Sequence, residues 1–222
     1  MAFTQADYAE VLADSGNIKE GVALMKQAIN NIREYLKRLP KTDSVSEPPE
    51  FALMLATYGL MSHKLGDSES AQQAFNEAFN LVQKPGDVKT LLFAETLCKL
   101  AELCNELHRN GMELESIGKQ LKDINDIIPY EHPITAKIKY TLVLIDHAYF
   151  PKKELEDVLS IQEACYGEIH PGNAACHELL MKVKKQINDV TAEEHGIKAA
   201  DICKKLKERE ESSWSFLWRW LI

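Results

Sequence analysis

The stretch TYGLMSHKLGDSESAQQAFNEAFNLV, residues 57–82, decides the fold. Without a gap it repeats the pattern of DYAEVLADSGNIKEGVALMKQAINNI, residues 7–32, at a constant offset of 50 residues. The matching pairs are Tyr8 with Tyr58, Ala9 with Gly59, Gly16 with Gly66, Gly21 with Ala71, Met25 with Phe75 and Ala28 with Ala78. A repeat of this length indicates a chain built from copies of one supersecondary unit.

The periodicity of the apolar residues predicts an all-α chain. In MELESIGKQLKDINDII, apolar residues recur every three or four positions from Leu114 to Ile128, which is the stripe of an amphipathic helix. Glycines and prolines such as Gly66 and Pro133 divide such stripes into helices of about 12 to 20 residues. Strand patterns are almost absent, so we expect antiparallel helical hairpins.

The small and aromatic residues of the second copy resemble the tetratricopeptide repeat (TPR) family. The matching positions are Gly59, Gly66, Ala71, Phe75 and Ala78, with Pro85 close to where such a unit ends. Small residues let two helices approach closely, and the large residue between them fills the remaining space. The first copy has Met25 in place of the aromatic and matches less well. The resemblance implies a right-handed α-α superhelix of helical hairpins.

Later segments resemble the longer repeats of the kinesin light chain type. In both YEHPITA, at Tyr130, and YGEIHPGNAA, at Tyr166, a His-Pro pair precedes the expected start of a helix, although the first copy lacks the glycine of that element. We expect a repeat domain over residues 1–190 with a linker or insertion at about 37–50. A capping helix over 191–211 and a tail over 212–222 would follow.

Composition limits the partners. The chain has 222 residues, with 26 Lys and Arg against 34 Asp and Glu, a formal net charge of −8. Such a field repels phosphate backbones, so nucleic acid is not an expected partner. The odd number of cysteines, five, in spacings without a zinc pattern, fits a reducing, cytoplasmic location. The N-terminal residues do not resemble a secretory or transit peptide.

No motif of a known catalytic or metal site occurs, so we expect no enzyme, no cofactor and no metal. Cys104 and His108 stand four residues apart on one expected helix, but a third ligand is missing, and we interpret the pair as structural. Cys176 and His177 are adjacent and would point to different faces. We expect His132 and His170 to pack or cap at helix starts, with pH sensing as the alternative.

The resemblance implies a groove lined by the first helix of each hairpin, which would hold a peptide or helix of a partner protein. Carrying the repeat positions over gives these groove candidates: Phe3, Glu10, Leu53, Ala56, Leu60, His63, Asn105 and His108. The Lys, Asn and Arg residues with which some TPR proteins clamp the C-terminal carboxylate of chaperones are missing. An apolar or amphipathic peptide is therefore the expected ligand.

All three tryptophans lie in the last nine residues. As a helix, this segment would place Trp214, Leu217, Trp218 and Leu221 on one face; as an extended chain, it would align Trp214, Phe216, Trp218, Trp220 and Ile222. Aromatic side chains of this size are costly to leave in water. Three destinations remain open: the protein's own core, a partner protein or the protein's own groove, and a membrane interface, with Lys204 and Lys205 just upstream.

The sequence thus favours a non-enzymatic TPR-type scaffold or adaptor that binds a protein segment in a concave groove. The alternative is a structural or assembly subunit, whose groove and Trp-rich tail are buried either in a larger complex or at a membrane face.

Overall fold

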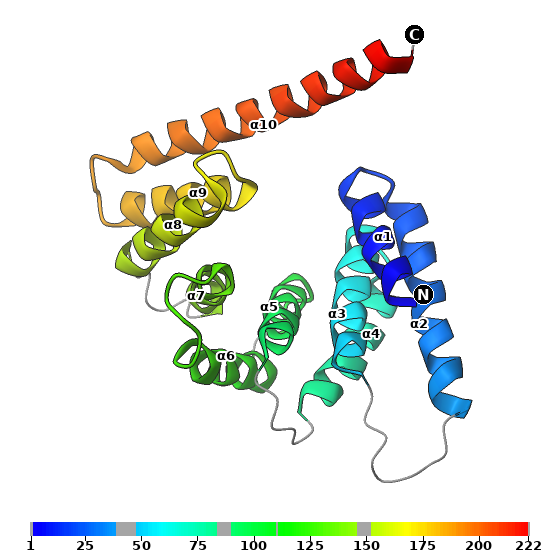
Figure 1. Ribbon diagram of the computed structural model, residues 1–222. Coiled ribbons are helices and arrows are strands. Elements are labelled where there is room, and N and C mark those ends of the chain that lie inside the picture. The colour runs from blue at the N-terminus through cyan, green and yellow to red at the C-terminus, as the bar shows by residue number, and fades with distance from the viewer. Residues whose placement is uncertain (1, 39–47, 84–89, 110, 146–151, 222) are drawn as a thin grey trace. The chain divides into compact units, whose positions relative to one another are not determined.

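The computed structural model describes residues 2–38, 48–83, 90–109, 111–145 and 152–221, and within these the side chains of Pro49 and of residues 210–221 are not described. Every regular element in these ranges is a helix, which confirms the all-α prediction (Figure 1). The chain forms two compact units, Met1–Ile124 and Asn125–Ile222.

The first unit contains helical hairpins, and a tight turn joins the two helices in each of the first two. Its helices are α1 (Ala2–Asp14), α2 (Ile18–Arg38), α3 (Pro49–Lys64), α4 (Ser68–Val82), α5 (Leu91–Glu106) and α6 (Met112–Asn125), the last ending one residue beyond the unit. Neighbours along the chain pack as α1 on α2 and α3 on α4. The two copies of the sequence repeat therefore correspond to two successive helical hairpins, as predicted.

The turn glycines have the backbone conformation that makes them necessary. Gly16 (φ 92°) and Gly66 (φ 83°) both adopt the left-handed conformation that ends the first helix of a hairpin. The next helix then begins with a cap, because the Asp67 carboxylate accepts a hydrogen bond of 3.0 Å from the Ser70 amide. The sequence repeat is thus a repeat of one turn geometry.

Close helix contacts explain the small residues. A Cβ atom on Gly21 would lie 2.6 Å from the Ala9 carbonyl oxygen, so α1 and α2 touch through backbone atoms. In the second hairpin the glycine stands on the other helix, since Ala71 replaces the glycine and Gly59 replaces the alanine. Gly59, however, leaves room mainly for α5, because a Cβ atom there would lie 2.4 Å from Leu103 Cδ2 but 3.4 Å from the Ala71 carbonyl oxygen of α4.

Within the first unit the helices form two layers. The first helices of successive hairpins contact each other in the order α1, α3, α5, while α2 packs on α3 and α4 on α5. The central helix α3 is buried almost all round, and Phe51, Leu55 and Ala56 are among its fully enclosed side chains. We call the side formed by α1, α3 and α5 the first-helix face.

The second unit repeats the hairpin theme with different residues. It contains α7 (Pro133–Ile145), α8 (Lys152–Tyr166), α9 (Pro171–Gln186) and α10 (Ala192–Leu221). Contacts run in chain order from α7 to α8, α9 and α10. Its core is apolar and includes Leu155, Val158 and Leu180.

The two His-Pro pairs begin helices, as predicted. His170 Nδ1 accepts a hydrogen bond of 3.1 Å from the Gly172 amide, and His132 Nδ1 accepts one of 3.1 Å from the Ile134 amide. These imidazoles therefore act as N-terminal caps of α9 and α7, a role usually taken by Ser, Thr, Asp or Asn. Burial lowers the pKa of His170, in keeping with a neutral ring whose Nδ1 is an acceptor.

Later hairpins keep the turn but not its glycine. His108 (φ 53°) follows α5 and Asn188 (φ 54°) follows α9, each two residues after its helix, the place that Gly66 has after α3. Asparagine tolerates this conformation, whereas histidine adopts it less readily. The absence of glycine at this position adds to the missing small-residue signature, so these hairpins look degenerate in the sequence.

One pair of facing residues is exchanged between hairpins. The two positions lie seven residues before the left-handed turn residue and eight residues after it. The second hairpin has Gly59 and Ala74 there, whereas the last hairpin has Met181 and Gly196. A Cβ atom on Gly59 would lie 2.4 Å from Leu103 Cδ2 of α5, and one on Gly196 would lie 2.6 Å from Met181 Sδ. A large side chain fills the space in both cases, but it comes from a different helix.

Candidate functional site

The first-helix face carries a polar bridge across three helices. Lys99 of α5 donates a hydrogen bond of 3.0 Å to the Thr57 hydroxyl of α3 and forms an ion pair with Glu10 of α1. The Lys99 side chain is only 11% exposed, whereas that of Glu10 is 46% exposed. Most of the solvent-accessible part of this bridge is therefore carboxylate.

The residues predicted to line a groove have different degrees of exposure. Phe3 is exposed and Leu53 is half-buried, so both offer apolar surface. Ala56 (0% exposed) and Leu60 (8%) lie within the packed part of α3, so they offer almost none. The accessible part of this face is therefore confined to side chains around the buried centre of α3.

A second polar contact joins α3 and α5. His63 Nε2 lies 3.3 Å from Glu106 Oε2. Asn105, the residue before Glu106 on α5, is half-buried, and His108 is exposed at the left-handed turn position. The structure thus brings His63 close to the end of α5, where the groove candidates Asn105 and His108 also stand.

Cys104 and Cys176, the two cysteines with a neighbouring histidine in the sequence pattern, are buried thiols. Burial raises the pKa of Cys104 to about 11, and its thiol donates to the Arg109 carbonyl oxygen at 2.8 Å. Burial likewise raises the pKa of Cys176 to about 12. A nucleophile requires the thiolate, so these two groups behave as small core residues. Among the described residues, no group of three or more His, Cys, Asp or Glu side chains is placed to hold a metal ion.

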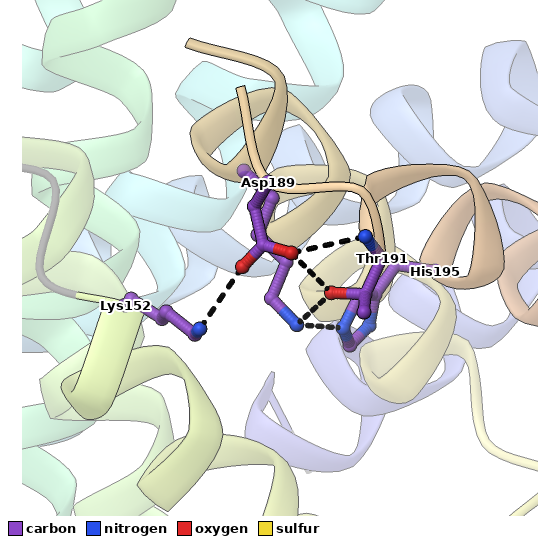
Figure 2. Close-up of polar contacts among 5 residues, drawn as sticks. Lys152, Asp189, Thr191 and His195 are labelled. Carbon is purple, nitrogen blue, oxygen red and sulfur yellow. Dashed lines mark hydrogen bonds and ion pairs between the residues drawn. The ribbon is translucent and has the colours of Figure 1, made fainter. Parts of the chain in front are cut away.

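A chain of polar groups, buried toward its histidine end, joins Lys152 of α8 to the last hairpin, as Figure 2 shows. Lys152 Nζ donates to Asp189 Oδ2 at 3.1 Å, and Asp189 Oδ1 accepts from the Thr191 hydroxyl at 2.7 Å. The same hydroxyl accepts from Lys184 Nζ at 3.1 Å. Lys184 also lies 2.7 Å from His195 Nε2, so the chain continues into α10. We call this set the buried polar chain.

The hydrogen bonds fix the proton positions at its histidine end. The Lys184 ammonium group can only donate, so His195 Nε2 must be the acceptor. The proton of neutral His195 is then on Nδ1, which donates to His177 Nδ1 at 2.9 Å. His177 is 3% exposed and Lys184 is 6% exposed, so this end of the chain is screened from water. Every hydrogen bond in this sequence thus has a donor and an acceptor.

Burial, with nearby cations, keeps both histidines neutral. Burial, the neighbouring His195, and then Lys198 and Lys184 lower the pKa of His177 to about 4. Burial and the same two lysines lower the pKa of His195 as well. Hydrogen bonds from Thr191 and Lys152 hold the pKa of Asp189 well below its usual range. The chain therefore combines an ionised carboxylate with two neutral imidazoles at neutral pH.

The tail residues belong to α10, whose backbone is helical to Leu221. Of the tail candidates Trp214, Phe216, Leu217, Trp218, Trp220 and Leu221, the structure thus gives the helical alternative for the backbone, while their side chains lie outside the description. In Figure 1, α10 runs well past the ends of α8 and α9. No helix among the described residues is long and apolar enough to cross a membrane.

Sequence analysis missed Lys99 and the buried polar chain. Lys99 is the lone basic residue of LLFAETLCKLAELCNE, and a single basic residue within an apolar helix is the signal that it needs a buried partner. His177 was considered only together with Cys176. Its actual partner, His195, stands 18 residues later, so no local spacing indicates the contact.

No protein-family model matches the chain, and no curated protein matches it. Solved structures do. A Podosopora anserina kinesin light chain protein with nearly identical TPR-like repeats is 17% identical, with 91% of this chain and 95% of that chain covered and a TM-score of 0.58. BtubC (BKLC) from P. vanneervenii is 15% identical, with 90% of this chain and 78% of that chain covered and a TM-score of 0.59. The predicted resemblance is confirmed, and this chain has the TPR-like helical-repeat fold.

Proposed function

We propose that the protein is a non-enzymatic scaffold or adaptor that binds a peptide or helix of another protein on the first-helix face. The bridge from Lys99 to Glu10 and Thr57 carries this proposal, because it holds three helices in fixed positions and leaves a half-exposed carboxylate on their common side. A rigid surface loses little conformational entropy on binding, which favours affinity.

The surroundings of the bridge indicate the chemistry of the ligand. Phe3 and Leu53 supply apolar surface, and Glu10, His63 and Asn105 supply polar groups. The one cation of the bridge, Lys99, is already committed to Glu10, so a carboxylate ligand would have to displace that partner. An amphipathic segment that places an apolar side chain beside Leu53 and a donor beside Glu10 fits better.

Site-specific photo-crosslinking tests the proposal in cells. A photoreactive phenylalanine analogue would replace Leu53 or His63 on the first-helix face, or the exposed Glu69 on α4 as the matched control. We expect discrete protein adducts from the first two positions and not from the third, and fewer of them when Glu10 is changed to Lys. Equal adducts at all three positions, or none at Leu53 and His63, would show that this face is not the binding surface.

A second role, attachment through the tail, is favoured by the length of α10. The helix continues to Leu221, and most described side chains between Cys203 and Arg209 are exposed. A helical tail would align Trp214, Leu217, Trp218 and Leu221 as one apolar face for a partner subunit or a membrane surface. Deleting residues 214–222 should abolish sedimentation with anionic vesicles or with a partner complex. Retained sedimentation would rule this role out.

A further inference from the structure

The outer side of the first hairpin has two exposed apolar residues, whereas their counterparts in the second hairpin are buried or half-buried. Met54, Tyr58 and Met61 of α3 correspond, at the 50-residue offset, to Thr4, Tyr8 and Val11 of α1. Met61 is 5% exposed, but Val11 is 62% exposed, and Tyr8 is 58% exposed. No described helix packs against Tyr8 and Val11 in the way that α2 packs against α3.

The equivalent surface of α3 is covered by α2. The nearest side-chain atom to a Cβ on Gly21 of α2 would be Met61 Cε, at 3.0 Å. Around Tyr58, a pocket of about 130 Å³ is lined on the α2 side by Lys26, Ile29 and Arg33. Arg33 reaches across to Glu77 of α4 in an ion pair of 2.5 Å. The occupant of this surface in the second hairpin is therefore a helix that combines a small residue, an apolar residue and two cations.

The charges around Tyr8 and Val11 suit the same kind of occupant. Asp7 and Asp14 stand beside them on α1. Glu20 of α2 corresponds, at the 50-residue offset, to Ser70, which lines the pocket in the second hairpin. All three carboxylates are exposed. Lys19 lies seven residues before Lys26 on α2, so both lysines are on the side of α2 that faces α3. Lys19 therefore does not stand among these three carboxylates. We call the surface of Tyr8, Val11, Asp7, Asp14 and Glu20 the end face.

We propose that the end face docks a basic amphipathic helix of a partner protein, in the arrangement that α2 has against α3. Helix α2 itself has this chemistry, with five basic and two acidic residues, a net charge of +3, around its apolar stripe. The apolar part of the partner helix covers Tyr8 and Val11, with a small residue opposite Val11 as Gly21 is opposite Met61. Its cations face the three carboxylates.

A peptide with the sequence of Ile18–Arg38 is the direct probe, because it carries the pattern that covers α3. Its fluorescein-labelled form would be titrated with the full chain and followed by anisotropy at low and high salt. We expect saturable binding that weakens as salt rises. Tyr8→Ser with Val11→Ser should weaken it at least about ten-fold, since these exposed residues supply the apolar contact.

Two matched controls separate the end face from general stickiness. Ile187→Ser with Val190→Ser removes two other exposed apolar side chains, and should leave the affinity unchanged. Asp7→Lys with Asp14→Lys should weaken binding, whereas Glu115→Lys with Glu178→Lys, the same change of net charge at other exposed positions, should not. Circular dichroism would verify that each variant folds.

Three results would overturn the proposal: no saturable binding, equal losses in the control variants, or binding that is insensitive to Tyr8→Ser with Val11→Ser. The last result would mean that the peptide enters the place of α2 within its own hairpin. Because the end face and the first-helix face contain different residues, the crosslinking test of the proposed function can succeed or fail independently.

Discussion

The first hairpins and the last hairpin share a fold but hold their helices together by different chemistry. Between α1 and α2 the contact is close and apolar, with Gly21 against the backbone of Ala9 and Ala13. Between α9 and α10 it includes Lys184, Thr191, His195 and His177, joined by hydrogen bonds. The comparison shows that one hairpin geometry accepts either tight packing or a satisfied polar network. The stability of the first hairpin should therefore respond to a change of side-chain volume, and that of the last hairpin to a change of protonation.

The largest expected effect is that of Gly21→Ala. A Cβ atom there would lie 2.6 Å from the Ala9 oxygen and 3.1 Å from the Ala13 nitrogen, both backbone atoms that cannot rotate away. We expect a loss of about 3 kcal/mol in unfolding free energy, measured by urea titration. In Gly196→Ala the close atom is the flexible Met181 Sδ, so that variant should change stability by less than about 1 kcal/mol. Equal losses would remove the contrast between the two hairpins.

Acid should loosen the last hairpin next. The pKa of His177 is about 4 in the folded chain and 6.5 when unperturbed, so the unfolded chain binds this proton first as pH falls. The stabilisation that comes from keeping His177 neutral is complete above pH 6.5 and is lost between pH 6.5 and pH 4. This loss lowers the free energy of unfolding by up to about 3 kcal/mol. Hydrogen exchange at about pH 7 and about pH 5, corrected for intrinsic rates, should show lost protection in α9 and α10. His177→Gln should flatten this dependence; an unchanged profile in that variant would contradict it.

Removing one hydroxyl from the buried polar chain should have a smaller effect. Thr191→Val deletes the group that accepts from Lys184 and donates to Asp189. We expect a loss of about 1–2 kcal/mol in urea unfolding, because buried partners lose their hydrogen bonds. Thr191→Ser keeps the hydroxyl and should recover most of the stability. If valine and serine behave alike, the chain does not stabilise this hairpin.

The smallest effect should be a gain. His108 adopts φ 53° where the first two hairpins use glycine. His108→Gly should therefore raise the free energy of unfolding by about 0.5–1 kcal/mol, which would be measured as a slightly higher thermal midpoint. Asn188→Gly should gain less, since asparagine tolerates this conformation. A loss on His108→Gly would mean that the imidazole makes a contact worth more than the relief of strain.

These elements also show how far the sequence could predict the structure. Gly16 and Gly66 revealed the hairpins because glycine signals a left-handed turn directly. His108 and Asn188 gave no such signal at two later turns, since nothing in those residue types alone requires that conformation. Lys99 could have been recognised as a candidate bridge from its apolar context, but its partner Glu10 lies 89 residues away and emerges only from the packing of helices.

The exchange of Gly59 and Ala74 for Met181 and Gly196 bears on how such chains can diverge. In the second hairpin Leu103, from the following hairpin, fills the space above Gly59, whereas in the last hairpin Met181 fills the corresponding space from α9 itself. The two positions can thus diverge in different ways, because the residue at 59 is constrained by a side chain of the next hairpin, whereas Gly196 is constrained by Met181 of its own hairpin. The last hairpin completes this contact by itself, while the second depends on the hairpin that follows it.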